Sequence, residues 1–404
     1  MLESAMQLPG LKMVTLPPST GYGDAAYEYI AGFDALGIPV TWTPTFFDSQ
    51  AHEHKATFEN KLHGAVREQV MRLWRRPIDY TVLLLNLPPL HGYADWLYEK
   101  PRVHLFAYVA WELERLPETW SPVLNQFECV FVPSEFNRRA FLASTIERPI
   151  YTVPHIARRM EPMANENEAS WNGIDDDDFV FYTIGSWTTR KAMEETVRCY
   201  LSTFVAGEKV ALIIKTDRVN AIELMAMSDE MRKRAPAHFA TVWWTLARII
   251  ADYPKPAKIL LMTDRLSSRK IDQLHARGDC FVSLTHSEGW GLGAFDALLF
   301  GNPVIMTGWG GQIDYLGADY PLAVRYTLEA TAKAPRDPHY LGLEDALWAY
   351  ADNHHAGQLM RSVFEDRKVA QALGREMQMR LRQRFAPPLV CRRFAELMRL
   401  EQEP

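Results

Sequence analysis

The segment from Phe281 to Ile305, FVSLTHSEGWGLGAFDALLFGNPVI, constrains the fold more than any other part of the chain. Its first four residues form a short apolar run that is typical of a buried strand. Residues 294–300 have the pattern of a helix that ends at Gly301. Between the predicted strand and helix lie three glycines, Gly289, Gly291 and Gly293. The segment therefore predicts a strand, a glycine loop and a helix, in that order.

The glycine loop is suited to binding a ligand at the start of the helix. A helix N-terminus leaves backbone N–H groups unpaired, and glycines let an anionic or hydroxyl-rich ligand approach the main chain closely. Two acids flank the loop, Glu288 at its entrance and Asp296 in the first turn of the predicted helix. Carboxylates so close to a phosphate would repel it unless they faced neutral hydroxyls. The pattern therefore favours a sugar or a ribose as the partner.

The length of the chain, 404 residues, suggests two domains. Short apolar runs alternate with helical segments, which is typical of α/β domains with parallel sheets. The polar and acidic segment from Arg158 to Asp178 differs from both of its neighbours and is interpreted as a linker. We expect a first domain at 1–158, a linker at 159–177 and a second domain at 178–375.

Composition and charge exclude several classes of function. The formal net charge of −6 argues against broad nucleic-acid binding. The four cysteines are scattered without a C-x-x-C pair, so neither a zinc site nor a disulfide framework is indicated. No apolar stretch approaches the length of a membrane span, and the first residues lack the layout of a signal peptide. These features predict a cytoplasmic protein.

The first half begins with a strand at 11–16, a helix at 25–36 and a strand at 39–43, which together form a βαβ unit. Gly21 and Gly23 lie in the loop before this helix. They do not form a dinucleotide fingerprint, because the third glycine is absent and no acid directly follows the second strand. The sequence therefore argues against a nicotinamide site.

Four further strands are predicted in the first half, at 80–86, 103–109, 127–132 and 149–153. His91 follows the first of these strands and either lies near the carboxyl edge of the sheet or caps a helix. Ser134 is positioned to accept hydrogen bonds from the first N–H groups of the helix that follows it.

In the second half, a strand at 178–186 leads through Gly185 to Arg190 and Lys191, which precede a helix at 192–204. A glycine turn followed by paired cations at a helix start is suited to a diphosphate, because the charges and the free N–H groups act on the same anion. Lys215, at the end of the strand at 210–215, either touches phosphate or extends its ammonium group to solvent.

Several of these motifs resemble glycosyltransferase family 4, whose members are retaining enzymes with two Rossmann-like domains, the GT-B fold. The resemblance rests on Glu288 and an acid eight residues later, on the stop at Gly301 and Pro303, and on the runs WELERLP at 111–117 and VPSEFN at 132–137. It implies a nucleotide-diphosphate sugar as co-substrate, with no cofactor and no metal ion. It also implies that a final helix at 376–404 returns to the first domain.

The resemblance assigns roles to residues of the second half. Glu288 would contact the transferred sugar, and Asp296 would contact the ribose with a shorter side chain than the glutamate of the family. Lys191 would hold the donor phosphates. Ser186 stands where the family has an arginine, so Arg190 would supply that charge. Further donor contacts are expected from the loop and from the segment that contacts the base in the family, at Gly289, Trp290, Gly291, Leu292 and Leu266.

In the first half, Gly21 and Gly23 would belong to the loop that closes over the donor sugar and the acceptor. Glu112 occupies the position of a family histidine near the reaction centre, although it equally suits a buried ion pair with Arg115. Some relatives dock to anionic membranes through a basic helix. An apolar stripe flanked by cations suits such contact or ordinary core packing, at Phe58, Leu62, Val66, Val70 and Trp74.

Two other functions suit the same motifs. A nucleotide-sugar 2-epimerase shares the fold and a carboxylate-rich cleft, and it would convert the donor without an acceptor. A non-catalytic subunit would bind a nucleotide sugar or a protein without turnover. The sequence does not distinguish the nucleotide, the sugar or the acceptor.

Overall fold

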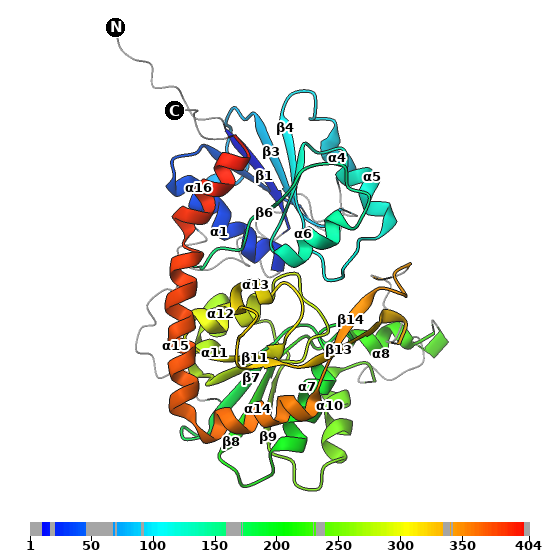
Figure 1. The fold of residues 1–404 in the computed structure, drawn as a ribbon, viewed down its shortest axis with the longest axis vertical. Coiled ribbons are helices and arrows are strands. Elements are labelled where there is room, and N and C mark those ends of the chain that lie inside the picture. The colour runs from blue at the N-terminus through cyan, green and yellow to red at the C-terminus, as the bar shows by residue number, and fades with distance from the viewer. Residues whose placement is uncertain are drawn as a thin grey trace. The chain divides into compact units, whose positions relative to one another are not determined.

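The computed structural model describes residues 10–16, 21–45, 68, 71–89, 93–158, 171, 173–228, 230–231, 239–333, 340 and 342–399. The chain divides into two compact units (Figure 1). Unit 1 comprises Met1–Arg159 and Gln383–Pro404, and unit 2 comprises Met160–Arg382. Each unit is built on a six-stranded sheet, which agrees with the two Rossmann-like domains expected from the sequence.

The sheet of unit 1 has the strand order β2-β1-β3-β4-β5-β6, and all neighbouring strands are parallel. The order reverses between β1 and β3, which is the kind of switch point where open α/β sheets bind ligands. Its strands are β1 (Leu11–Thr15), β2 (Val40–Pro44), β3 (Val82–Asn86), β4 (His104–Tyr108), β5 (Cys129–Val132) and β6 (Ile150–Thr152).

The described helices of unit 1 are α1 (Gly21–Ala35), α4 (Ala94–Leu97), η2 (Glu118–Trp120), α5 (Ser121–Leu124), α6 (Glu135–Leu142) and α16 (Pro387–Leu397). Helix α6 begins as predicted, because the Ser134 hydroxyl accepts a hydrogen bond from the Asn137 N–H at 3.1 Å. Helix α1 begins earlier than predicted, so Gly21 and Gly23 lie in its first turn instead of in a loop. Glycine is tolerated there because the first turn has few intrahelical hydrogen bonds to lose.

The last helix, α16, packs on α1, as the sequence led us to expect. A Cβ atom on Gly32 of α1 would lie only 2.2 Å from the Cys391 sulfur, so the missing side chain allows this close approach. The Phe394 ring of α16 contacts Tyr29 of α1 and Phe131 of β5, with centroid distances of 5.3 and 4.8 Å. The C-terminal helix is therefore part of the core of unit 1.

The sheet of unit 2 has the order β12-β11-β10-β7-β8-β9 and is also parallel. Its switch point lies between β7 and β10. The strands are β7 (Phe179–Ile184), β8 (Val210–Lys215), β9 (Lys258–Met262), β10 (Cys280–Ser283), β11 (Val304–Thr307) and β12 (Ala323–Val324). A separate antiparallel hairpin consists of β13 (Tyr326–Ala330) and β14 (Leu347–Ala351).

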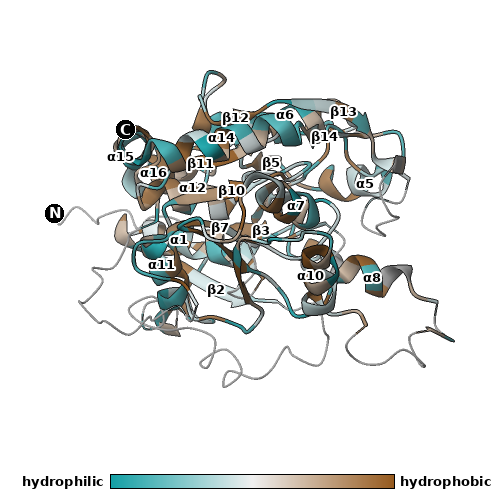
Figure 2. Ribbon diagram, turned by 90° about the horizontal axis from the view of Figure 1, so that it is seen from below, coloured by the Kyte–Doolittle hydropathy of each residue, from teal (hydrophilic) through white to brown (hydrophobic). Residues whose placement is uncertain are grey.

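The helices of unit 2 include α12, which starts at Leu292 because the left-handed Gly291 (φ 88°) is its N-cap. Asp296 therefore lies in the second turn, and its predicted place in the first turn is wrong. Figure 2 shows α12 in brown along most of its length. The described helices here are α7 (Met193–Thr203), α8 (Ala221–Ala226), α10 (Val242–Ala251), α11 (Ser268–Arg277), α12 (Leu292–Leu299), α13 (Ile313–Leu316), η3 (Thr331–Lys333), α14 (Asn353–Glu365) and α15 (Arg367–Arg384).

Some of the predicted positions lie outside the described residues. They are His91 and four positions of the proposed membrane-docking stripe, Phe58, Leu62, Val66 and Val70. The fifth position, Trp74, packs edge-on against Trp42 with ring centroids 5.5 Å apart. Among the helices that the structure describes, none has the length and apolar composition needed to cross a membrane.

Candidate functional site

A cluster of charged residues lies at the switch point of unit 2. Strand β7 ends at Ile184 and leads through Gly185 to the cations that precede α7. Strand β10 ends at Ser283 and leads through the glycine loop to α12. Because β7 and β10 are parallel neighbours, the loops that follow them meet at the same edge of the sheet.

Glu288 is held between the two cations of the β7–α7 loop. Its side chain is only 9 % exposed. Carboxylate Oε1 lies 2.5 Å from Lys191 Nζ, and Oε2 lies 3.1 Å from Arg190 Nη1. The structure thus brings together three residues that the sequence analysis selected from positions nearly 100 residues apart.

The backbones of the two loops are also joined. Arg190 Nη1 donates to the Ser287 carbonyl at 2.7 Å. The Arg190 carbonyl in turn accepts from the His286 N–H at 2.8 Å and from the Thr285 hydroxyl at 3.0 Å. Thr285 was not among the predicted site residues. Its position after a central strand is one where ligand-binding residues are often found. These bonds fix the cations relative to the carboxylate before any ligand arrives.

Glu288 is ionised in this environment. Burial raises the pKa of its carboxyl group, but the opposing effect of Lys191 and Arg190 is larger, and the pKa lies below its ordinary value. Two cations and one carboxylate leave the cluster with one net positive charge. A buried carboxylate of this kind depends on its cations, because loss of both would leave an uncompensated charge.

The turn that carries the cations has a strained residue at its end. Ala192, the N-cap of α7, has φ 47° and ψ 43°, which is the left-handed region that non-glycine residues avoid. This conformation costs about 1–2 kcal/mol. The Ala192 N–H donates to the Thr189 carbonyl at 3.0 Å, which closes the turn around Arg190 and Lys191. Backbone strain that surrounding contacts maintain is a feature of functional sites.

The glycine loop on the other side allows little room for side chains. A Cβ atom on Gly291 would lie 3.2 Å from the Tyr315 hydroxyl and 3.5 Å from Glu288 Cγ. Gly289 is buried, and Leu292 is the half-buried first residue of α12.

The Trp290 indole packs against two aromatic rings. Its ring centroid lies 5.2 Å from that of Phe295 and 5.1 Å from that of Tyr315. The indole of Trp290 therefore belongs to the core, so any ligand contact from this residue would involve its main chain.

The hairpin β13–β14 contacts the loop that follows β10. The Ala349 N–H donates to the His286 carbonyl at 3.0 Å, and His286 Nδ1 lies 2.9 Å from the Ala349 carbonyl, to which it donates. The His286 ring also stacks on Trp348 at 5.4 Å and 17°. Burial, together with Arg190, lowers the pKa of His286, so this imidazole is neutral. These bonds could not be predicted from the sequence, because they join His286 to a hairpin that is distant in the chain.

The remaining predicted residues of unit 2 differ in exposure. Lys215 ends β8, pairs in register with Ile184, and donates from Nζ to the Thr216 carbonyl at 2.9 Å. Burial lowers the pKa of Lys215. Ser186 is exposed, Leu266 is half-buried in the segment before α11, and Asp296 is half-buried in α12.

Three predicted residues belong to unit 1. Glu112 is half-buried in the segment after β4, and its charge contributes, after burial, to raising the pKa of Tyr22. Gly21 and Gly23 flank this tyrosine in the first turn of α1. These residues therefore share one region of unit 1.

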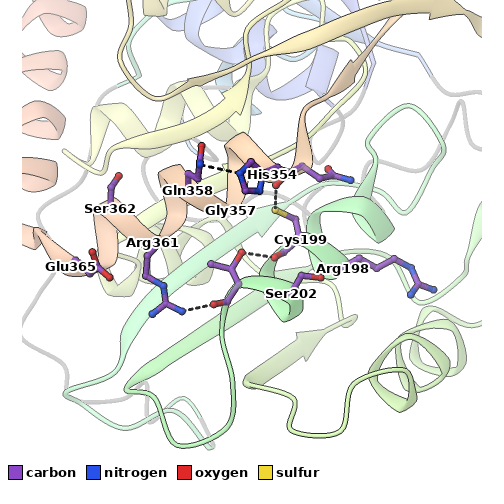
Figure 3. A pocket seen from close by; sticks show the side chains of 11 residues that line it. Arg198, Cys199, Ser202, His354, Gly357, Gln358, Arg361, Ser362 and Glu365 are labelled. Carbon is purple, nitrogen blue, oxygen red and sulfur yellow. Dashed lines mark hydrogen bonds between the residues drawn. The ribbon is translucent and has the colours of Figure 1, made fainter.

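A groove of about 560 Å³ lies elsewhere in unit 2, between α7 and α14 (Figure 3). Its cations already have acidic partners: Arg361 pairs with Glu208, and Arg198 pairs with Asp252. The Cys199 sulfur donates to the Asn353 carbonyl at 3.3 Å. Because its two arginines have acidic partners and none of the residues around Glu288 lines it, we interpret this groove as a gap between packed helices.

Among the described residues, one group of three acids has the spacing of metal ligands. Carboxylate oxygens of Asp175, Asp177 and Asp178 lie within 4.8 Å of one another. The ammonium groups of Lys209 and Lys258 form ion pairs with them, at distances of 2.6 to 3.4 Å. Two lysines therefore provide the positive charge that a metal ion would otherwise supply.

No model of a protein family matches this chain, and no curated protein matches its sequence. Its structure, however, is similar to solved structures over nearly the full length. Sucrose-phosphate synthase from Thermosynechococcus elongatus has a TM-score of 0.64 at 14 % identity, covering 97 % of this chain and 98 % of that one. HepE from Anabaena, in complex with UDP, has a TM-score of 0.58 at 13 % identity, covering 97 % and 100 %.

The pneumococcal O-GlcNAc transferase GtfA, in complex with UDP and GlcNAc, has a TM-score of 0.55 at 9 % identity, covering 97 % of this chain and 99 % of that one. At such identities the likeness concerns the fold alone. Two parallel six-stranded sheets, a C-terminal helix that returns to the first unit and this likeness identify the fold as GT-B.

Proposed function

We propose that the chain is a glycosyltransferase that moves a sugar from a nucleotide-diphosphate donor, bound by unit 2, to an acceptor hydroxyl. The observation that carries the proposal is the buried contact of Glu288 with Arg190 and Lys191 at the β7–β10 switch point. A net positive cluster beside a glycine loop suits a diphosphate, and the carboxylate suits sugar hydroxyls. Two of the similar structures contain UDP, which supports UDP-sugars as the first donors to test.

The chemistry follows from where charge develops. As the bond between the anomeric carbon and the β-phosphate oxygen breaks, its electron pair leaves with the nucleoside diphosphate, and the sugar becomes oxocarbenium-like. Arg190 and Lys191 stabilise the negative charge on this leaving group, since they are already fixed in place. The acceptor oxygen forms the new bond to the anomeric carbon, and its proton passes to the phosphate oxygen that leaves.

Glu288 has two tasks in this proposal. Without a ligand, its carboxylate keeps the two cations together at a buried site. With the donor bound, the N–H groups of the cations that do not contact Glu288 bind the diphosphate, and the carboxylate accepts hydrogen bonds from the sugar. Transfer without a metal ion follows from the charge that Arg190 and Lys191 supply. Retention of the anomeric configuration is proposed from the resemblance of residues 281–305 to retaining enzymes.

A first experiment identifies the donor. Melting temperatures are measured with UDP-, GDP-, ADP- and CMP-sugars, because a ligand that binds only the folded state raises the melting temperature by mass action. Donor turnover is then measured for wild type and Glu288→Gln. Loss of one preorganised charged group should lower kcat by about 10²–10³-fold.

Glu208→Gln is the matched control. Glu208 also forms an ion pair with an arginine, Arg361, in unit 2, but outside the proposed site. The control should keep the wild-type kcat, even if both variants lose stability. Equal turnover in wild type and Glu288→Gln would contradict the proposal. Conversion of a UDP-sugar without any acceptor, to its 2-epimer, would favour the epimerase instead.

A further inference from the structure

The segment between β11 and α13, residues 308–312, packs against the glycine loop of the candidate site. The Gly311 N–H donates to the Glu288 carbonyl at 2.7 Å. A Cβ atom on Gly310 (φ 116°) would lie 3.0 Å from the same carbonyl oxygen and 3.2 Å from the Glu288 nitrogen. A glycine at this position therefore allows the two main chains to approach closely. The segment fixes the main chain at the entrance to the glycine loop.

The buried amide of Gln312 closes the turn that contains Gly311. Gln312 is 0 % exposed. Its Nε2 donates to the Thr307 carbonyl at 2.9 Å and to the Trp309 carbonyl at 2.5 Å. These bonds hold the residues on both sides of the turn together, so they set the position of Gly311 relative to the end of β11.

The other end of the glycine loop is held by Tyr315 of α13. The Tyr315 hydroxyl donates to the Gly291 carbonyl at 3.2 Å. The same carbonyl accepts the Phe295 N–H at 3.0 Å, which is the first helical bond of α12. Gly291 is the left-handed N-cap of this helix. The hydroxyl therefore ties the point where the loop becomes a helix to α13.

The hydroxyl of Tyr315 keeps its proton and remains a donor. The side chain is 0 % exposed, and its ring lies 5.1 Å from the rings of both Trp290 and Phe295. Burial, followed by the charge of Glu288, raises the pKa of Tyr315 well above its ordinary value. A phenylalanine would fill the same space without the cost of burying a hydroxyl. The hydrogen bond to Gly291 is what the tyrosine adds.

Restraint of this loop matters for affinity. Glycine reaches more backbone conformations than other residues, so a glycine loop that nothing holds would spend part of its time in conformations that do not fit a ligand. The apparent dissociation constant rises in inverse proportion to the fraction of molecules whose site has the binding conformation. Contacts at Glu288 and at Gly291 keep that fraction high before a ligand binds.

We propose that Tyr315 is a positioning residue of the donor site. Its hydroxyl holds the loop at 289–291 in the conformation that binds the nucleotide-diphosphate sugar, and it does so without touching the ligand. This inference rests on the proposed function and adds the segment 308–316 to the two loops that form the site. A purely structural hydroxyl would contribute to stability alone, whereas a positioning hydroxyl also contributes to the affinity for the ligand.

Hydrogen exchange of the unliganded protein is the first test, with Tyr315→Phe as the variant. This substitution keeps the ring and removes the hydrogen bond to Gly291. We expect amide exchange at 288–293 to become about 3–10-fold faster than in wild type, because the loop loses one hydrogen bond. Exchange at the wild-type rate in these residues would overturn the proposal.

Tyr320→Phe is the matched control. Tyr320 is 6 % exposed, and its hydroxyl accepts the Val304 N–H at 3.0 Å, so it also forms one hydrogen bond with the main chain of unit 2. Val304 begins β11, at the edge of the sheet opposite the glycine loop. Both variants should lower the melting temperature by about 2–4 °C. Faster exchange at 288–293 in both variants alike would indicate general destabilisation and would also overturn the proposal.

The affinity for UDP, measured by isothermal titration calorimetry, is the second test. We expect Tyr315→Phe to bind UDP about 3–10-fold more weakly than wild type, because part of the binding free energy is then used to order the loop. Tyr320→Phe should bind UDP with the affinity of wild type. Equal affinities of wild type and Tyr315→Phe, or an equal loss in both variants, would contradict a positioning role.

Failure of this inference and failure of the proposed function give different results. If none of UDP, GDP, ADP and CMP, nor any of their sugars, stabilises the wild type, the proposed function fails, and the role of Tyr315 in donor binding fails with it. If another nucleotide stabilises the wild type more than UDP, that nucleotide replaces UDP in the second test. If the nucleotide binds wild type and both variants equally, only the role of Tyr315 fails.

Discussion

Several residues with unfavourable local surroundings lie at carboxyl ends of parallel strands. Asn86 ends β3 with an amide that has no hydrogen-bond partner among the described residues, Glu288 is a buried carboxylate after β10, and Ala192 has left-handed backbone geometry after β7. Each of these features lowers stability when considered alone. Local rules of sequence and structure are broken mostly at functional positions, where binding compensates for the loss. At the residue scale, Glu288 and Ala192 therefore mark the edge of unit 2 where a ligand is expected.

His155 in unit 1 is a buried polar residue whose environment is structural. Its Nδ1 lies 3.2 Å from the Tyr29 hydroxyl and 3.3 Å from the Tyr108 hydroxyl. Burial lowers the pKa of His155 from 6.5 to about 3. Between these two values the unfolded chain binds a proton that the folded chain does not bind. Stability is therefore complete above pH 6.5 and decreases as the pH falls toward 3.

We expect His155→Gln to reduce this pH dependence. From pH 7.5 to pH 5, the histidine accounts for a loss of about 2 kcal/mol in the free energy of unfolding, which the variant should not show. Urea denaturation at both pH values measures the difference. His104→Gln, which removes a histidine that is 51 % exposed and contacts Glu128, serves as the control for the substitution itself. Parallel pH profiles for wild type and His155→Gln would refute the assignment.

At the scale of elements, glycines decide how the last two helices pack. In unit 2, a Cβ atom on Gly374 of α15 would lie 2.0 Å from the Gly301 carbonyl oxygen. In unit 1, a Cβ atom on Gly32 of α1 would lie 2.2 Å from the Cys391 sulfur of α16. Overpacking a close contact forces side chains and backbone to move. Each helix is therefore held by shape at one glycine as well as by apolar burial.

Gly32→Ala should destabilise unit 1 by about 1–3 kcal/mol, because the new methyl group collides with the Cys391 sulfur. Cys391→Ala removes that sulfur, so the double variant should be more stable than the sum of the two single effects predicts. Urea denaturation of the four proteins completes the cycle. Trypsin cleavage at Arg392 and Arg393 of α16 reports separately whether the helix has detached. Additive effects would show that Gly32 does not act through this sulfur.

At the scale of the whole molecule, each unit contains its own parallel sheet and its own switch point. Unit 2 has the cationic cluster with Glu288 at its switch point, whereas unit 1 has the buried amide of Asn86 there. The two edges therefore have different electrostatic character. The charge of the first edge suits a nucleoside diphosphate.

Hydrogen exchange with UDP tests this division in the intact protein. UDP should slow amide exchange at 185–192 and 284–291 of unit 2, because it binds these loops only in the folded state. Exchange at 82–89 and 104–112 of unit 1 should change little, since UDP lacks the transferred sugar and the acceptor. Protection confined to the segments of unit 1 would contradict the assignment of the nucleotide to unit 2.

The sequence by itself determined the α/β class, the strand–glycine loop–helix order at 281–305, the cap at Ser134 and the choice of Arg190, Lys191 and Glu288 as candidates. These features depend on periodicity, turn chemistry and residue type, which are local properties of the chain. The first residue of a helix was harder to predict from local pattern. Gly21 and Gly23 lie inside α1 and not before it, and Asp296 lies one turn later in α12 than predicted.

Only the tertiary structure decided the strand order of each sheet and hence the two switch points. It also decided that Glu288 pairs with both cations, that Ala192 is left-handed and that the Asn86 amide lacks a hydrogen-bond partner among the described residues. The physical reason is that strand pairing and the satisfaction of buried polar groups depend on contacts between residues far apart in the chain. Such contacts exist only once the sheet has formed.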